Sequence, residues 1–129
     1  MPLLPFASMT AGRLLIPRRI AKRELRDGPA RNEAITAWRK SVFDRLPAKG
    51  VTGCRLLKAY VTTPHGPRRT LYLLQDASGD SILLMHRPKG DPIGDNMAYA
   101  NPDFRAAVDK AIATAAEDIE AGEFEAVER

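Results

Sequence analysis

The stretch RRTLYLLQDASGDSILLMHR, residues 68–87, decides the fold class. Its two halves are rich in Leu, Ile, Tyr and Thr, which favour β-strands, and the Asp-Ala-Ser-Gly-Asp segment between them is typical of a turn. Residues 71–74 and 82–85 are apolar at every position. Because successive side chains of a strand point to opposite faces, this pattern predicts a hairpin that other elements cover on both faces.

A third strand is expected before this hairpin. Residues 55–62, RLLKAYVT, favour a strand, and PHGP at 64–67 supplies a turn. Connections this short join antiparallel neighbours, so the three strands predict a meander. Residues 12–16 form a further apolar run, ended by Pro17, and are a candidate for a first strand.

Two helices are expected between that first strand and the meander. One runs from Pro17 to about Arg26, and the next from about Ala30 to Leu46, where apolar residues recur at three- and four-residue spacing. The Asp-Gly-Pro joint between them predicts a helical hairpin with one solvent-exposed face. The charged residues of that face in the second helix are Arg31, Glu33, Arg39, Lys40 and Arg45.

The chain after the meander is expected to form a fourteen-residue loop, 88–101, and a last helix, 102–121. Asn101 is a suitable N-cap, Pro102 suits the first helical position, and Gly122 ends the helix. Together these elements predict an α+β fold. The helical hairpin is expected on one face of the antiparallel sheet, and the last helix on the other.

The domain organisation follows from these elements. Residues 13–122 are expected to form a single domain, since 129 residues is an ordinary length for one domain. Residues 1–12 are interpreted as a leader. Residues 123–129 are interpreted as an acidic tail, whose alternation favours a short exposed strand or an arm.

Charge is distributed unevenly along the chain. Residues 1–110 carry 19 Lys and Arg against 10 Asp and Glu, whereas residues 111–129 carry one Arg against six acidic residues. A basic body attracts anions such as phosphate backbones. The alternative interpretation is a set of solvated helix faces. The acidic tail is expected either to mask the basic body or to keep it soluble.

Several functional classes find no support in the sequence. Cys54 is the only cysteine, so an internal disulfide is excluded, and a buried thiol is its simplest interpretation. No apolar run approaches the roughly 20 residues that span a bilayer, and a cytoplasmic location is expected. No Cys, His or carboxylate spacing fits a metal site, and no glycine-rich phosphate loop is present, so no cofactor is expected.

The order strand, helix, helix, three antiparallel strands and helix resembles the RelE/ParE superfamily of bacterial toxins from toxin–antitoxin pairs. Four stretches within about residues 13–120 carry the resemblance: PRRIAKREL at 17–25, RLLK at 55–58, RRTLYLL at 68–74 and HRPK at 86–89. The resemblance is one of pattern, because this superfamily has no sharp short motif. The long loop and the acidic tail depart from the family's pattern.

The resemblance implies a toxin that acts as an endoribonuclease on mRNA, typically on the ribosome, and that a cognate antitoxin protein silences. Two alternatives stay open. One is a toxin of the same fold that inhibits DNA gyrase without cleaving RNA. The other is a non-toxic module that binds nucleic acid or a protein partner.

Metal-free RNA cleavage uses the neighbouring 2′-hydroxyl as nucleophile, so the protein must supply a base, an acid and cations for the phosphate. A histidine suits proton transfer and arginine suits phosphate binding. The candidate catalytic residues are His86, Arg87, Arg68, Arg69 and Tyr72. The candidate nucleic-acid-binding residues are Arg55, Lys58 and Lys89.

Simpler interpretations exist for the same residues. His86 is also suited to a strand end where it bonds to the backbone, and Tyr72 to a half-buried core position. Tyr60 and Tyr72 are both suited to stack on a base. The turn at 76–80 leaves either an odd or an even number of residues between the two strands. An odd number places His86 on the same face as Arg68, and an even number places Arg87 there. The sequence leaves this open.

Overall fold

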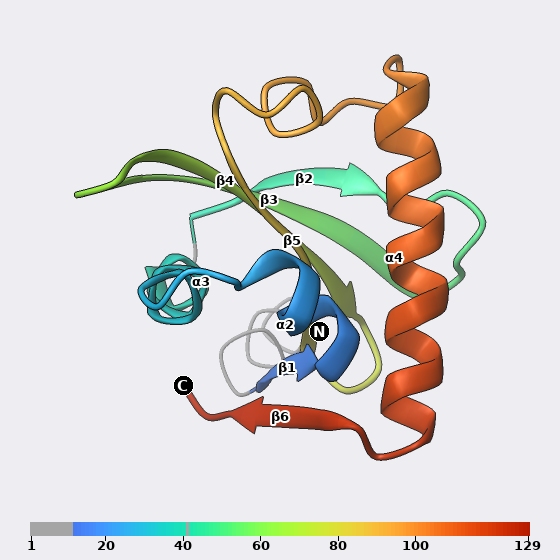
Figure 1. Ribbon diagram of the computed structural model, residues 1–129. Helices are drawn as coiled ribbons and strands as arrows, with labels where there is room; N and C mark the ends of the chain where they lie inside the picture. Colours follow the sequence, from blue (N-terminus) through green and yellow to red (C-terminus); the bar gives the residue numbers. More distant parts are fainter. Residues whose placement is uncertain (1–11, 41) are drawn as a thin grey trace.

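The computed structural model describes residues 12–40 and 42–129 (Figure 1). The described part is α+β, with three helices and a six-stranded mixed sheet. The proposed leader, residues 1–12, lies outside it apart from Gly12. The elements are β1 Leu14–Pro17, α2 Arg18–Glu24, α3 Ala30–Lys40, β2 Asp44–Pro47, β3 Cys54–Thr63, β4 Gly66–Gln75, β5 Ser81–Pro88, α4 Pro102–Glu120 and β6 Phe124–Val127.

The strands lie in the order β2-β3-β4-β5-β1-β6. β3, β4 and β5 pair antiparallel in chain order, which confirms the predicted meander. β1 confirms the candidate first strand and lies parallel to β5, and β6 pairs antiparallel with β1. The residues interpreted as an acidic tail therefore form an edge strand of the sheet. This pairing satisfies a row of β1 backbone groups that would otherwise be free.

The second helix ends earlier than the sequence predicts. α3 ends at Lys40 rather than at Leu46, and residues 44–47 form β2 along β3. Val42, one of the apolar residues within the expected helix, is exposed. The strand pairing supplies backbone partners that the last turn of a helix lacks, so the edge of the sheet outcompetes the extra helical turns.

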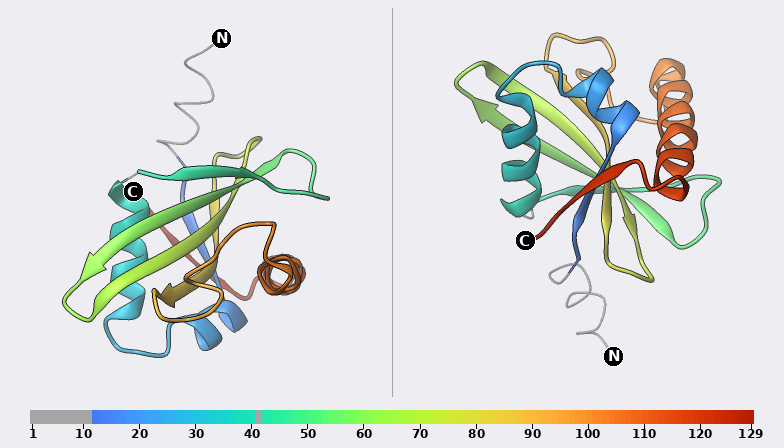
Figure 2. Two further views of the ribbon diagram at one scale, coloured as in Figure 1. Left: turned by 90° about the horizontal axis from the view of Figure 1, so that it is seen from above. Right: turned by 60° about the horizontal axis from the view of Figure 1, so that its bottom comes forward.

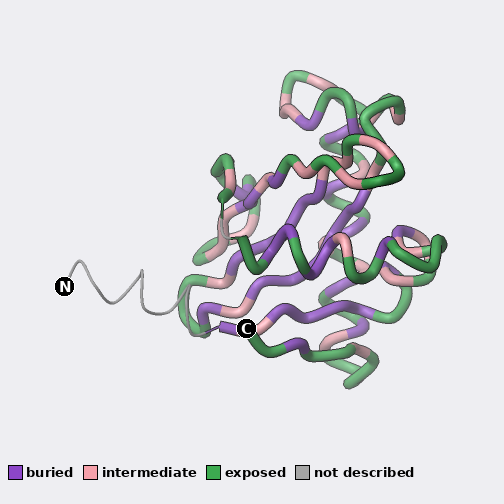
Figure 3. The backbone as a smooth tube through the Cα atoms, turned by 90° about the vertical axis from the view of Figure 1, so that its left-hand side faces the viewer, coloured by how far each residue is buried: buried purple, intermediate pink, exposed green. Residues whose placement is uncertain are grey.

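The meander is buried on both faces, as expected. Leu71 and Tyr72, which point to opposite faces, are both fully buried. Tyr72 donates its hydroxyl hydrogen to the carbonyl oxygen of Ala34 in α3 at 2.6 Å. On the other face, Lys58 donates to the carbonyl oxygen of Met97, before α4, at 3.2 Å. Figure 2 shows α3 and α4 on either side of the strands, and Figure 3 shows the buried residues concentrated along them.

The two helices before the meander do not form one covering layer, contrary to the expected hairpin. α3 packs against β3, whereas α2 packs against α4, β5 and β1. Arg19 of α2 donates its backbone N–H to Asp118 of α4 at 2.8 Å and its side-chain Nε–H to the same carboxylate at 2.7 Å. Burial raises the pKa of Asp118, but these bonds outweigh it and lower the pKa. The spacing of apolar residues, on which the helical hairpin was predicted, gives no sign of such a polar contact between α2 and α4.

α4 begins and ends where the sequence predicts. The Asn101 side chain accepts the backbone N–H of Asp103 at 3.1 Å, and Pro102 occupies the first helical position. Gly122 follows the helix with a φ of 75°, a conformation that glycine adopts without steric cost. In the described residues, no helix combines the length and apolar character needed to cross a membrane.

Two substitutions on β6 test its place in the sheet. Val127 is buried opposite Leu14, whereas Ala126 beside it is exposed. Val127→Asp should lower the free energy of unfolding by more than about 2 kcal/mol, because an unpaired charge is buried. Ala126→Asp should change it by less than about 0.5 kcal/mol. Urea denaturation measures both, and equal small effects would contradict a packed edge strand.

Candidate functional site

The register of β4 and β5 settles which charged side chains share a face. Thr70 lies directly opposite His86, and Arg69 lies opposite Arg87. Because Arg68 and Thr70 are two residues apart on one strand, Arg68 shares the face of His86. Arg69 points to the other face. Next to the turn, Leu74 lies opposite Ser81, and this even spacing alone would place Arg87 beside Arg68. The register shifts by one residue between Leu71 and Tyr72, and this irregularity places the histidine there instead.

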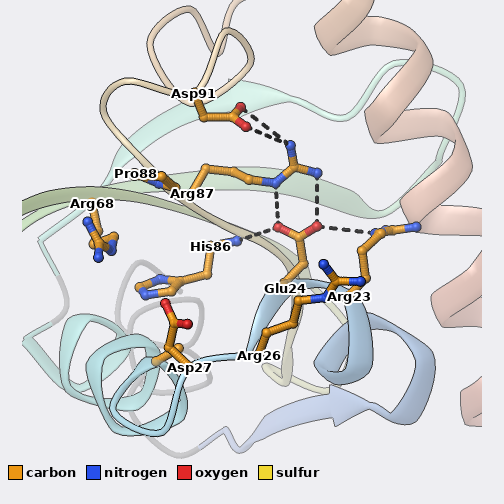
Figure 4. Close-up of a pocket in the computed structure, with 10 residues that line it drawn as sticks. Arg23, Glu24, Arg26, Asp27, Arg68, His86, Arg87, Pro88 and Asp91 are labelled. Carbon is orange, nitrogen blue, oxygen red and sulfur yellow. Dashed lines mark hydrogen bonds and ion pairs between the residues drawn. The ribbon is translucent and has the colours of Figure 1, made fainter.

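A cleft of about 420 Å³ opens where the ends of α2 and β5 meet (Figure 4). Three of the five candidate catalytic residues, Arg68, His86 and Arg87, line it together. Four arginines and three carboxylates are among its lining residues, so its charges are nearly balanced. The full lining is Arg23, Glu24, Arg26, Asp27, Ala30, Arg68, His86, Arg87, Pro88 and Asp91.

His86 is bonded at both ring nitrogens. Its Nε2 lies 3.2 Å from the Glu33 carboxylate, and its Nδ1 lies 2.8 Å from the Thr70 hydroxyl. Burial lowers the pKa of His86 and outweighs the opposing effect of Glu33, so the neutral ring is favoured at neutral pH. A neutral ring that donates from Nε2 to the carboxylate accepts the Thr70 hydroxyl hydrogen at Nδ1. The backbone N–H of His86 donates to Glu24 at 3.0 Å.

Glu33 is the carboxylate that gathers the groups around His86. It lies in α3, and its side chain is only 10% exposed, although the sequence placed it on a solvent-exposed helix face. His65 lies 3.4 Å away and the Nε of Arg68 lies 3.8 Å away. Burial raises the pKa of Glu33, but hydrogen bonds from His86, Thr63 and His65 outweigh it and lower the pKa. The carboxylate is therefore ionised beside a neutral imidazole.

Glu24 is the carboxylate that binds Arg87. Its side chain is 1% exposed, and both oxygens accept from the Arg87 guanidinium, at 2.6 and 2.9 Å. Arg23 donates to the same carboxylate at 3.1 Å, and Asp91 lies 3.4 Å from Arg87. This fork-to-fork pair fixes the position of Arg87. It also means that a phosphate must compete with Glu24 to bind Arg87.

The two other candidate catalytic residues lie outside the cleft lining. Tyr72 is fully buried and bonded to α3, and burial raises its pKa, so its hydroxyl keeps its proton. This placement agrees with the simpler interpretation of Tyr72 as a core residue. Arg69 lies on the opposite face of the sheet, with its guanidinium carbon 4.4 Å from the centre of the Tyr60 ring.

The candidate nucleic-acid-binding residues occupy three separate places. Arg55 forms an ion pair with Asp76 at 3.1 Å. Lys58 lies beside Tyr60, with its Nζ 5.5 Å from the ring centre. Lys89 lines a second cleft of about 430 Å³, which shares Arg68 and Pro88 with the first. No single surface gathers all three.

Sequence reasoning missed the two carboxylates that hold the site together. Glu33 lies between Ala30 and Ala34, both buried, and this spacing is a signal that its assignment to the solvent-exposed face overlooked. No comparable signal marks Glu24, which is the last residue of its helix. Its partner Arg87 is 63 positions later in the chain, and only the fold brings the two together.

Cys54 and the acidic residues carry no sign of a separate centre. Cys54 is a half-buried free thiol, and burial raises its pKa, which disfavours the reactive thiolate. Among the described residues, no group of three or more His, Cys, Asp or Glu side chains is placed to hold a metal ion.

Comparison with known proteins returned no match: no family model, no curated protein and no solved structure is significantly similar to this chain.

The His86–Glu33 pair makes stability depend on pH. The folded pKa of His86 lies below its ordinary value of 6.5, so as the pH falls through 6.5 the unfolded chain gains a proton that the folded chain does not. The free energy of unfolding should therefore fall. The lowered pKa of Glu33 adds a second loss below its ordinary value of 4.5.

His86→Gln should remove the decrease in the free energy of unfolding that begins as the pH falls through 6.5. His65→Gln, at a ring that is half-exposed, is the matched control and should keep it. Urea denaturation between pH 5.5 and 7.5 measures both variants. If the free energy of unfolding of His86→Gln falls with pH as steeply as that of the wild type, a buried neutral imidazole is contradicted.

Proposed function

We propose that this chain is a toxin of the RelE/ParE kind that cleaves mRNA without a metal ion. The observation that carries the proposal is the convergence of Arg68, His86 and Arg87 on one cleft. A metal-free ribonuclease needs such a meeting of phosphate-binding cations and a proton-transfer group. The order of strand, two helices, antiparallel meander and helix also supports the resemblance, and β2 and β6 are two strands added to that order.

In the proposed reaction, the 2′-oxygen of one nucleotide attacks the adjacent phosphorus. His86 takes the proton of that hydroxyl, and the ionised Glu33 stabilises the imidazolium that forms. The bond from phosphorus to the 5′-oxygen of the next nucleotide breaks, and the proton passes from His86 to that oxygen. The products are a 2′,3′-cyclic phosphate and a 5′-hydroxyl. Arg68 stabilises the charge that gathers on the phosphate.

The proposal assigns Arg87 and Thr70 smaller parts. Arg87 is a positioning residue, because Glu24 occupies its fork, and it fixes the end of β5 beside His86. The Thr70 hydroxyl holds Nδ1 of His86, so the substrate proton reaches this nitrogen only after Thr70 gives up its hydrogen bond. RNA binding must therefore rearrange the cleft.

A second candidate function is binding without cleavage, as in a toxin that inhibits DNA gyrase or in a non-toxic binding module. Two observations favour it. The His86 side chain is 2% exposed with both nitrogens bonded, and Arg87 is neutralised by a buried carboxylate. Ion-pair networks of this kind also occur as purely structural features outside active sites.

A cognate antitoxin is part of the proposal. α4 buries small side chains, Ala111 and Ala115, beside Phe104 and Val108, so it contributes little apolar area per turn. A helix from an acidic partner can compete for this place on the sheet. We expect the protein encoded next to this chain to co-purify with it and to restore growth.

That expectation is tested by expressing the chain alone and together with its immediate genomic neighbour. Growth arrest on solo expression, relieved by the neighbour, is the expected result. Normal growth in both cases, with no co-purifying protein, would favour a non-toxic binding module.

Substitutions in the cleft test the chemistry. His86→Ala should lower the rate of RNA cleavage by about 10²- to 10⁴-fold, because it removes the proton-transfer group, while RNA binding stays within a few-fold. Arg68→Ala should reduce the rate through loss of the phosphate clamp. Fragmentation of mRNA and growth arrest are scored together in induced cells.

Lys58→Ala is the matched comparison, since it should weaken binding and leave the chemical step unchanged. Circular dichroism confirms that each variant is folded. Full toxicity in all of these variants would contradict the cleft as the active site. Toxicity with intact mRNA and altered DNA supercoiling would identify gyrase inhibition instead.

A further inference from the structure

An exposed aromatic ring between two cations lies on the opposite face of the sheet from His86. Tyr60 of β3 is 49% exposed, and in the described part of the chain it is one of two large apolar side chains open to solvent. The Arg69 guanidinium carbon lies 4.4 Å from its ring centre and the Lys58 Nζ lies 5.5 Å from it. We call these three residues the Tyr60 surface.

The cations of the Tyr60 surface differ from those of the cleft in their partners. Arg87 of the cleft is paired with the buried Glu24, and the Nε of Arg68 lies 3.8 Å from the largely buried Glu33. Within the described ranges, neither Lys58 nor Arg69 forms an ion pair: Lys58 donates to the carbonyl oxygen of Met97, and Arg69 lies over the Tyr60 ring. The acidic residue paired with Lys58 across the sheet is Asp44 of β2. A phosphate can therefore bind here without displacing an existing ion pair.

The Tyr60 surface is joined to the cleft by a row of residues across the sheet. Tyr60 lies directly opposite Arg69, and Arg69 lies directly opposite Arg87. Neighbouring strands are about 4.8 Å apart, so the row extends about 10 Å from the ring to the cleft residue. A chain held at Tyr60 therefore lies two strand spacings from the cleft residue Arg87.

We propose that the Tyr60 surface binds single-stranded RNA. An unpaired base stacks on the Tyr60 ring, and Lys58 and Arg69 contact the flanking phosphates. Stacking on aromatic rings beside cations is how proteins bind single strands without reading their sequence. Bases of a duplex are already stacked inside the helix, so a ring on an open strand surface selects unpaired RNA.

This inference rests on the proposed function for its choice of RNA, but the binding itself requires no cleavage. It can therefore be measured on a probe that the proposed reaction cannot cut. A 2′-O-methyl 12-nucleotide single strand, labelled with fluorescein, has no free 2′-hydroxyl. A blunt duplex of the same sequence is the comparison, and fluorescence anisotropy reports both affinities.

The wild-type chain should bind the single strand more tightly than the duplex. Tyr60→Ala should weaken single-strand binding by roughly 5- to 150-fold, whereas Tyr60→Phe should stay within about twofold of wild type. Lys58→Ala and Arg69→Ala should each lower the slope of log affinity against log salt by about 0.7. Lys110→Ala, at an exposed lysine of α4, is the matched cation control and should leave the slope unchanged.

Equal binding by wild type and Tyr60→Ala, or equal affinity for single strand and duplex, would overturn the inference. Circular dichroism of each variant confirms the fold. Loss of this surface and loss of the proposed function give different results. Tyr60-dependent binding in a chain that neither cleaves RNA nor arrests growth supports the surface and contradicts the ribonuclease. If Tyr60→Ala still cleaves RNA and binds the single strand with unchanged affinity, the ribonuclease is supported and the Tyr60 surface is contradicted.

Discussion

Two carboxylates, the buried Glu24 and the largely buried Glu33, are the constraint on which the candidate site depends. An ionised carboxylate away from water costs several kcal/mol unless donors surround it. Glu24 is surrounded by Arg87, Arg23 and the backbone N–H of His86. The ring of His86 bonds to Glu33. The ends of α2, α3 and β5 therefore have to meet at one place, and the cleft forms there.

This constraint divides the cations of the protein into two kinds. Those of the cleft, such as Arg68 and Arg87, are held in fixed positions by carboxylates. This pairing orients the guanidinium groups but weakens their attraction for a phosphate. Lys58 and Arg69 lie beside an aromatic ring instead and keep their charge available. A protein that binds RNA on one surface and acts on it at another needs both kinds, and the row from Tyr60 to Arg87 joins them.

Much of this fold could be predicted from the sequence, because the deciding signals are local. The apolar runs, the turns between them and the Asn101 cap define the meander and α4 without reference to distant residues. The end of α3, the packing of α2 on α4 and the strand register depend on contacts between distant segments. The candidate cations could be named in advance for the same local reason. Their partners Glu24 and Glu33 could not, because only the folded chain brings them together.

The products of RNA cleavage test the central claim most directly. Purified protein is incubated with a single-stranded RNA in the presence of a metal chelator, and the ends of the fragments are analysed. The account predicts fragments that end in a 2′,3′-cyclic phosphate and begin with a 5′-hydroxyl, and their loss in His86→Ala. Fragments that begin with a 5′-phosphate, or cleavage that is unchanged in His86→Ala, would contradict it.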